Sequence, residues 1–172
     1  MRHALAAFAL LALGACAATA PKITTLQGYR DRSALIGVTS RFDTERFGGL
    51  WYVRAQFDPG APQLSFRLMP DAMRLGAPAC DAAGVCSEVA EDLPLRRLGN
   101  GRFSVVMPSG EAREFWVLWV DEGFRTAVLG NPQGTFGWIV DRSTTGGADR
   151  IRAAREILDF NGYDVSRLRG ME

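Results

Sequence analysis

Histidine is almost absent from this sequence of 172 residues. The one histidine, His3, lies in an N-terminal segment that we expect to be removed. Without histidine, neither a Ser/His/Asp nor a Cys/His nucleophilic site can form, and zinc sites that use histidine are excluded. Apart from Cys16, the sequence has only Cys80 and Cys86, too few for a thiolate metal cluster. We therefore expect no metal site, no cofactor and no catalytic residues, and hence a protein that is not an enzyme.

The charges also lack a dominant sign. Twenty Lys and Arg residues accompany 19 Asp and Glu residues, which gives a formal net charge of +1, and the basic residues form no stripe. A protein that follows a phosphate backbone needs a basic surface, so nucleic acid is not an expected partner. A length of 172 residues with 47% hydrophobic residues allows one domain with a sizeable core and leaves no room for a second.

No hydrophobic run in the sequence has the length of a membrane span. A short basic start, Met1 to His3, is followed by an apolar run from Ala4 to Leu13, which is typical of a signal peptide. Gly14 and Ala15 then lead into Cys16. This pattern resembles the bacterial lipoprotein signal, in which the cysteine is diacylated and becomes the mature N-terminus.

The expected organisation follows from lipidation at Cys16. Residues 1–15 are predicted to be the signal peptide, 16–41 the lipidated N-terminus and tether, and 42–172 the folded domain. Ala17, rather than Asp, follows the cysteine, which by analogy with lipoprotein sorting favours the outer membrane, with the domain facing the periplasm. Acyl chains would supply ~0.8 kcal/mol per buried methylene, enough for stable anchoring. A secretory signal cleaved elsewhere is the alternative.

Cys80 and Cys86 flank five residues that resemble a turn. In an oxidising periplasm the two thiols would pair across a hairpin. A loop this small removes little chain entropy, so the bridge would contribute less than ~3 kcal/mol and mainly fix the hairpin. Two free thiols are the alternative.

Most of the chain after residue 48 shows strand-like alternation, in eight runs separated by turn residues. Such spacing is typical of a β-sandwich or a β-barrel. The runs are Gly49–Phe57, Gln63–Met69, Ala72–Ala79, Cys86–Leu98, Gly101–Met107, Glu111–Val120, Phe124–Gly130 and Thr135–Asp141. Pro94 interrupts the fourth run, which indicates an edge or a bulge. The sequence therefore predicts an all-β fold, with the least definite boundaries in residues 72–98.

A single helical pattern follows the strands, from Ala148 to Phe160. Ile151, Ala154 and Leu158 share one stripe, and Asn161 with Gly162 provides a stop. We expect this amphipathic helix to pack on the outside of the sheet.

Three short motifs in this chain resemble the signatures of the lipocalin family. The first consists of Phe42, Asp43, Arg46, Phe47, Gly49, Trp51 and Tyr52. The second, normally Thr-Asp-Tyr, is matched loosely by Asp121 and Phe124, with Val120 in place of the Thr. The third ends at Arg142, after Trp138–Asp141. The stretch 124–165 resembles in particular the bacterial lipoprotein lipocalins and their apolipoprotein D relatives.

The resemblance implies an eight-stranded antiparallel up-and-down β-barrel with one C-terminal α-helix. It also assigns structural roles to Gly49, Trp51, Asp121 and Arg142. The last three should converge at the closed end of the barrel, where an Arg guanidinium stacked on a Trp ring contributes ~0.5 to 2 kcal/mol.

In such a barrel alternate residues of each strand point inward. Taking Trp51 and Arg142 as inward-facing, the period of two predicts the ligand-binding side chains. They are Val53, Ala55, Phe57, Leu64, Phe66, Leu68, Met73, Leu75, Phe103, Val105, Met107, Phe115, Val117, Trp119, Ala127, Leu129, Phe136, Trp138 and Val140. So apolar a lining, with adaptable methionines, suits a hydrophobic small molecule. The family resemblance implies a fatty acid or lysophospholipid, held for transport, storage or scavenging at the envelope.

Two other functions are compatible with the same residues. The apolar side chains can fill the barrel as a solid core, leaving a structural or interaction lipoprotein that docks a partner through Trp116 and Leu118 on the outer face. A lipid-acting enzyme would need an Asp or Glu on the strands as acid or base. An oligomer is compatible with each of these functions.

Overall fold

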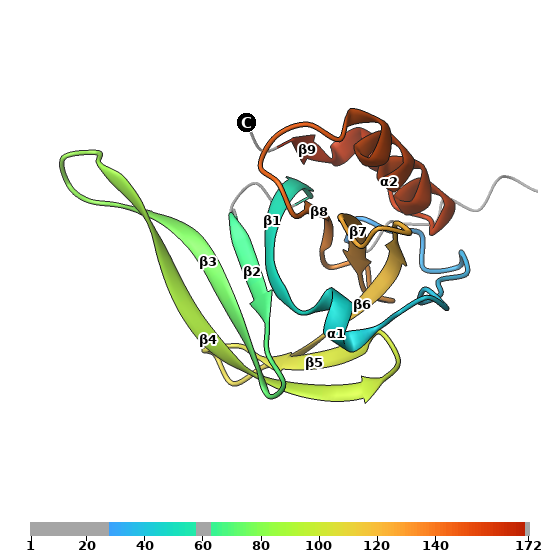
Figure 1. Ribbon diagram of the computed structural model, residues 1–172, viewed down its shortest axis with the longest axis horizontal. Helices are drawn as coiled ribbons and strands as arrows, with labels where there is room; N and C mark the ends of the chain where they lie inside the picture. Colours follow the sequence, from blue (N-terminus) through green and yellow to red (C-terminus); the bar gives the residue numbers. More distant parts are fainter. Residues whose placement is uncertain (1–27, 58–62, 171–172) are drawn as a thin grey trace, which may run out of the picture.

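The strands of this chain curl into a closed barrel with one long helix on its outside (Figure 1). The computed structural model describes residues 28–57 and 63–170. The elements are α1 (Thr44–Phe47), β1 (Gly49–Gln56), β2 (Ser65–Leu68), β3 (Ala72–Cys80), β4 (Cys86–Gly99), β5 (Arg102–Val106), β6 (Ala112–Val120), β7 (Thr126–Gly130), β8 (Gly137–Asp141), α2 (Ala148–Phe160), η1 (Val165–Arg167) and β9 (Arg169–Gly170). Each strand from β1 to β7 pairs antiparallel with the next, and β8 pairs back with β1, which closes the barrel; β9 adds to the other side of β1 near its end. The predicted up-and-down barrel with one C-terminal α-helix is confirmed.

Apolar side chains on the concave side of the strands form an inner core. Trp51 and Phe66 are fully buried where β1 and β2 pair, and Val53 lies opposite Val140 where β1 meets β8. Phe103, Val117 and two residues of β7, Ala127 and Leu129, also belong to this inner cluster. Burial of these side chains on both sides of the closing strand supplies the main driving force for closure.

A second apolar cluster lies between the outer wall of the barrel and α2. Ala154 and Leu158 of the helix are fully buried in it together with Val128 and Ile139. The predicted stripe therefore packs on the barrel as expected. No helix in residues 28–57 and 63–170 is long and apolar enough to cross a membrane.

The outer face of β6 is covered by this second cluster. Leu118 belongs to it, and Trp116 packs against it. Trp116 and Leu118, the two side chains expected to form a docking surface, are therefore packed in or against the apolar cluster between the barrel and α2.

Two bulges change which residues face inward, and they correct three of the predicted lining residues. The register of β1 shifts between Val53 and Ala55, and that of β6 shifts between Val117 and Trp119. A bulge inserts one residue and so reverses the alternation beyond it. Ala55, Phe57 and Trp119 consequently pack in the outer cluster, whereas Val120 lies in the inner one. The prediction that these three line the interior was wrong.

The chain before the first signature also packs on the barrel. The Tyr29 N–H donates to the Gly134 carbonyl at 2.8 Å, and the Tyr29 ring stacks on Phe57 with centroids 5.2 Å apart. Arg30 is only 1% exposed; its guanidinium donates to main-chain carbonyls, including that of Asn161 at 2.7 Å. Residues from Gly28 onward, within the segment expected to be a tether, are thus bound along the barrel wall.

The β3–β4 hairpin extends well beyond the barrel (Figure 1). It pairs without interruption from Ala72 opposite Pro94 to Cys80 opposite Cys86. The predicted disulfide is present at its tip, with an S–S distance of 2.01 Å. β4 continues through Pro94, so the strand is not interrupted there as the sequence indicated; Pro94 is the last residue of β4 paired with β3, and the pairing with β5 begins at Leu95.

Candidate functional site

The barrel has a filled end, built around Trp51 and Arg142. The Arg142 guanidinium carbon lies 3.7 Å from the centroid of the Trp51 ring. Its nitrogens donate to the carbonyl oxygens of Leu50 at 2.7 Å and Gly48 at 2.8 Å. Trp51 in turn donates from Nε1 to the Phe47 carbonyl at 2.8 Å. This end is closed by the predicted cation–π contact, whose partners are engaged in structural hydrogen bonds.

Asp121 lies at the same end but organises the β6–β7 turn. Its carboxylate accepts from the N–H groups of Arg125 at 2.5 Å and Thr126 at 2.7 Å, and it pairs with the Arg125 guanidinium at 2.8 Å. Burial alone would raise the pKa of Asp121, but these hydrogen bonds outweigh it and lower the pKa. The turn holds Phe124 at φ 55°, and the Phe124 carbonyl accepts from Arg142 Nε at 3.3 Å. Asp121 thus supports Arg142 through the turn and not by direct contact.

A polar cluster under α2 also belongs to this end, and no sequence motif predicts it. Thr126 and Asp141 are both buried and hydrogen-bonded to each other. Arg150 of α2 donates to the Thr126 hydroxyl at 2.8 Å and pairs with Asp141 at 3.2 Å. Because its residues come from β7, β8 and α2, only the folded chain brings them together.

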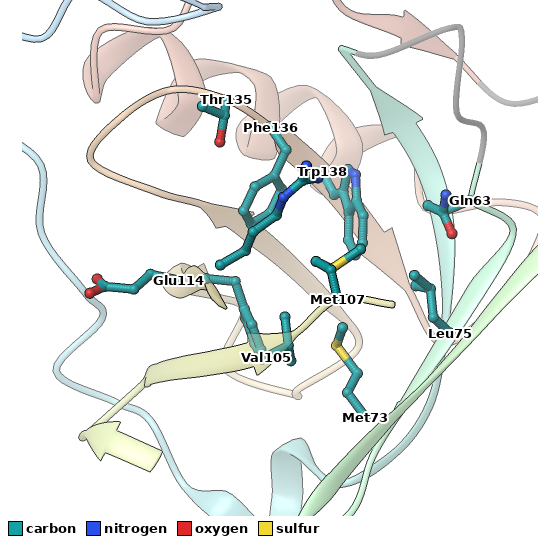
Figure 2. A pocket seen from close by; sticks show the side chains of 11 residues that line it. Gln63, Met73, Leu75, Val105, Met107, Glu114, Thr135, Phe136 and Trp138 are labelled. Carbon is teal, nitrogen blue, oxygen red and sulfur yellow. The ribbon is translucent and has the colours of Figure 1, made fainter. Parts of the chain in front are cut away.

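The opposite end of the barrel contains a cavity of about 160 Å³. Its position follows from the elements that reach it: Gln63 precedes β2, Met107 follows β5, and Thr135 precedes β8. Figure 2 shows Met73, Met107 and Val105 gathered below Phe136 and Trp138, with Glu114 extending away from the group. The barrel is therefore solid in one half and hollow in the other.

The predicted lining residues divide between these two halves. Those that line the cavity are Met73, Leu75, Val105, Met107, Phe115, Phe136 and Trp138. Those packed in the inner core are Val53, Phe66, Leu68, Phe103, Val117, Ala127, Leu129 and Val140. Leu64, half-buried just before β2, donates its N–H to the Gly76 carbonyl at 2.9 Å.

The cavity is also lined by four polar residues that were not predicted from the sequence: Gln63, Arg113, Glu114 and Thr135. Arg113 pairs with Glu111 at 3.0 Å, and Glu114 accepts from Trp116 Nε1 at 3.1 Å. A signal for Arg113 was present, because it has the same parity as Phe115 on β6. A charged side chain at an inward-facing position does not by itself indicate whether it lies in the barrel or at its mouth. The cavity thus has an apolar body and a partly polar mouth.

The described residues offer little to hold a metal ion. Across 28–57 and 63–170, no group of three or more His, Cys, Asp or Glu side chains is placed to do so. What the cavity presents instead is aromatic, aliphatic and thioether surface, which favours burial of apolar atoms.

Comparisons with known proteins agree with this architecture. The family model described as a lipocalin-like domain matches residues 101–172. Lobster apocrustacyanin A1 is similar in structure, with a TM-score of 0.54 and 13% identity over 75% of this chain and 78% of that one. H1 crustacyanin from the lobster Homarus americanus gives a TM-score of 0.53 and 12% identity over 88% and 91% of the two chains. A comparison with curated protein sequences gives no match.

The chain has the lipocalin fold, and its residues 101–172 match the lipocalin-like family model. Proteins of this family typically bind hydrophobic small molecules, and they are generally carriers and not enzymes.

Proposed function

We propose that this protein binds a hydrophobic small molecule with an acyl chain, a fatty acid or a lysophospholipid, for transport, storage or scavenging. The observation that carries the proposal is the cavity at one end of the barrel, lined by Met73, Met107 and Trp138 among other apolar side chains. Apolar surface moved from water into such a cavity gains ~25 cal/mol per Å² before the costs of association.

The proposed setting is the periplasmic face of the outer membrane, with the protein anchored through lipidated Cys16. The support comes from the sequence pattern before Cys16 and from the position of Gly28. Tyr29, the next residue, is bonded to Gly134 in the β7–β8 turn, at the cavity end of the barrel. The segment from Cys16 to Gly28 can span at most ~40 Å fully extended. An anchored chain would therefore hold its cavity mouth close to the bilayer from which an acyl ligand comes.

The test is a binding titration on protein stripped of bound lipid, using an environment-sensitive fluorescent fatty acid. Saturable binding that unlabelled fatty acid competes away is the expected result. Met107→Trp should fill the cavity and weaken binding at least ~tenfold, a loss of ~1.4 kcal/mol. Val106→Trp is the matched control, because Val106 directly precedes Met107, ends β5 and is 41% exposed. Absence of saturable binding, or equal loss in both variants, would contradict the carrier proposal.

Turnover is checked in the same experiment. Incubation with lysophospholipid followed by mass analysis should return the ligand unchanged. Appearance of free fatty acid in proportion to protein would instead indicate a lipid-acting enzyme.

A further inference from the structure

A continuous series of aromatic ring contacts crosses the inside of the barrel. It starts at the cavity, with Phe136 and Trp138 at 5.3 Å between ring centroids, and passes from Trp138 to Phe66 at 6.2 Å. Phe66 stacks on Trp51 at 6.3 Å with the rings 8° from parallel. Trp51 contacts Phe47 at 4.8 Å.

The series then returns to the cavity along the opposite wall. Phe47 contacts Phe42 at 5.2 Å, and Phe42 meets Phe103 at 5.6 Å in an edge-on arrangement. Phe103 stacks on Phe115 at 4.9 Å, and Phe115 lines the cavity. Both ends of the series therefore border the cavity, and its middle occupies the barrel beneath.

The middle rings leave no passage for a ligand. Trp51, Phe47 and Phe66 have no exposed surface, and Phe103 is 1% exposed. Large planar rings have few rotamers, and here each is held by ring contacts on more than one side. Met73 and Met107, which line the cavity, can change shape more readily than these rings.

The cavity above the rings is small for a lipid. Its volume of about 160 Å³ compares with an engineered cavity of ~150 Å³ that accepts one benzene molecule. Typical small-molecule sites measure ~300–1,000 Å³. A long acyl chain cannot be enclosed in the space above the aromatic layer.

Resting on the carrier function proposed above, we propose that this aromatic layer is a chain-length stop, with Phe66 as its central residue. The site takes a short or medium acyl chain, or the terminal part of a longer one, whose remaining methylenes stay outside the mouth. Gln63, Arg113 and Thr135 give that mouth polar surface. The ligand class is thus a medium-chain fatty acid or a similarly compact apolar acid.

The experiment measures the Kd of a series of saturated fatty acids from hexanoate to palmitate, each below its micelle concentration, on the full mature chain. Each methylene that enters the cavity should tighten binding about fourfold. Beyond a medium length the gain per methylene should stop, since added carbons remain in water. Affinity that rises steadily up to palmitate would overturn the length stop and leave the carrier function intact. Absence of binding at every length would overturn the carrier function itself.

The role of Phe66 is tested by asking whether its replacement changes the chain length at which affinity stops rising, which we call the plateau. Phe66→Leu and Phe66→Ala should enlarge the cavity downward, so that the gain per methylene continues to longer chains. Phe57→Leu is the matched control, because Phe57 is also almost fully buried (1% exposed) but lies in the outer cluster. It should leave the plateau in place. A plateau that stays unchanged in a folded Phe66→Leu protein would overturn the assignment of the stop to Phe66. The plateau of the unsubstituted chain tests the length stop even if the alanine variant does not fold.

Discussion

Arg142 lies with its guanidinium carbon 3.7 Å from the centroid of the Trp51 ring and bonds at the same time to two separate segments of the closed end. One segment runs from α1 into β1 and supplies the carbonyls of Gly48 and Leu50; the other is the β6–β7 turn, through Phe124. A single planar side chain thus joins the end of β8 to the start of β1 and to the turn. No lysine can reproduce so many directed donors.

Arg142→Lys should lower the free energy of unfolding by ~2–3 kcal/mol, because several charged hydrogen bonds to main-chain carbonyls are lost while the positive charge is kept. Urea denaturation gives this value. Arg102→Lys is the control: Arg102 lies over Trp116 at 5.3 Å on the exposed surface, so its replacement should change the value by less than ~0.5 kcal/mol. Binding of fatty acid in the Arg142 variant should be unaltered, since the cavity is at the other end. A loss of binding without loss of stability would contradict the structural role.

Asp121→Asn should destabilise the fold at neutral pH by ~1–2 kcal/mol, since a charged acceptor of turn N–H groups becomes neutral. The pKa of Asp121 is lowered in the folded protein, so the stability it contributes is present above its unfolded pKa of 3.8 and is lost as the pH falls below that value. The difference in the free energy of unfolding between the two proteins, measured by urea denaturation, should therefore shrink as the pH is lowered from about 6 towards about 3. Glu122→Gln, at the exposed neighbouring position, should give no such trend.

The sequence was a good guide to the fold because closing a lipocalin barrel leaves marks that are local in the chain. Gly49 with Trp51, and Arg142 at the end of β8, lie at fixed places relative to the strands they begin and end. The alternation of Leu, Phe and Val in β5 and β2 likewise predicts which residues face inward, and the structure places Phe66, Phe103 and Val105 inside.

The site was predicted less well, because the alternation of apolar and polar residues predicts neither bulges nor contacts between distant segments of the chain. The shift after Val53 turns Ala55 and Phe57 outward, and neither Gly nor Pro lies between Val53 and Phe57 to mark it. Alternation also cannot distinguish a packed inward side chain from one at a cavity. Phe66 and Trp138 have the same pattern in sequence, yet only Trp138 lines the cavity. The difference arises from the aromatic residues of α1 and its flank, which fill one end.

Tyr163 should make the fold sensitive to alkaline pH. Burial raises the pKa of its phenol to about 12, although the hydrogen bond from the Asn131 N–H and the charge of Arg30 act in the opposite direction. A folded pKa above the unfolded value of 10.0 means that the stability is fully present below pH 10 and is lost as the pH rises towards 12. The loss over this window should reach ~2–3 kcal/mol.

The measurement is urea denaturation of the unsubstituted protein and of Tyr163→Phe between about pH 8 and about pH 11.5. Tyr163→Phe should be less stable at pH 8 by ~1–2 kcal/mol, because the hydroxyl bonds to the Asn131 and Phe136 main chain at 2.9–3.1 Å are lost. The two proteins should then converge as the pH rises, since the variant has no phenol to ionise at this position. Parallel curves would show that Tyr163 does not titrate with unfolding.

Gly130→Ala should destabilise the protein through a clash with Tyr163, and the Tyr163→Phe variant tests this cause. An added Cβ would overlap the Tyr163 hydroxyl oxygen and lie 3.0 Å from Leu118 Cδ1. Overpacking of this kind costs ~1–3 kcal/mol. In the Tyr163→Phe background the hydroxyl is gone, so the same substitution should cost at least ~1 kcal/mol less, a coupling that a double-mutant cycle measures. Gly37→Ala is the control, because a Cβ there meets nothing within 4 Å. Strictly additive effects of Gly130→Ala and Tyr163→Phe would mean that β7 and the chain after α2 are not in the close contact described here.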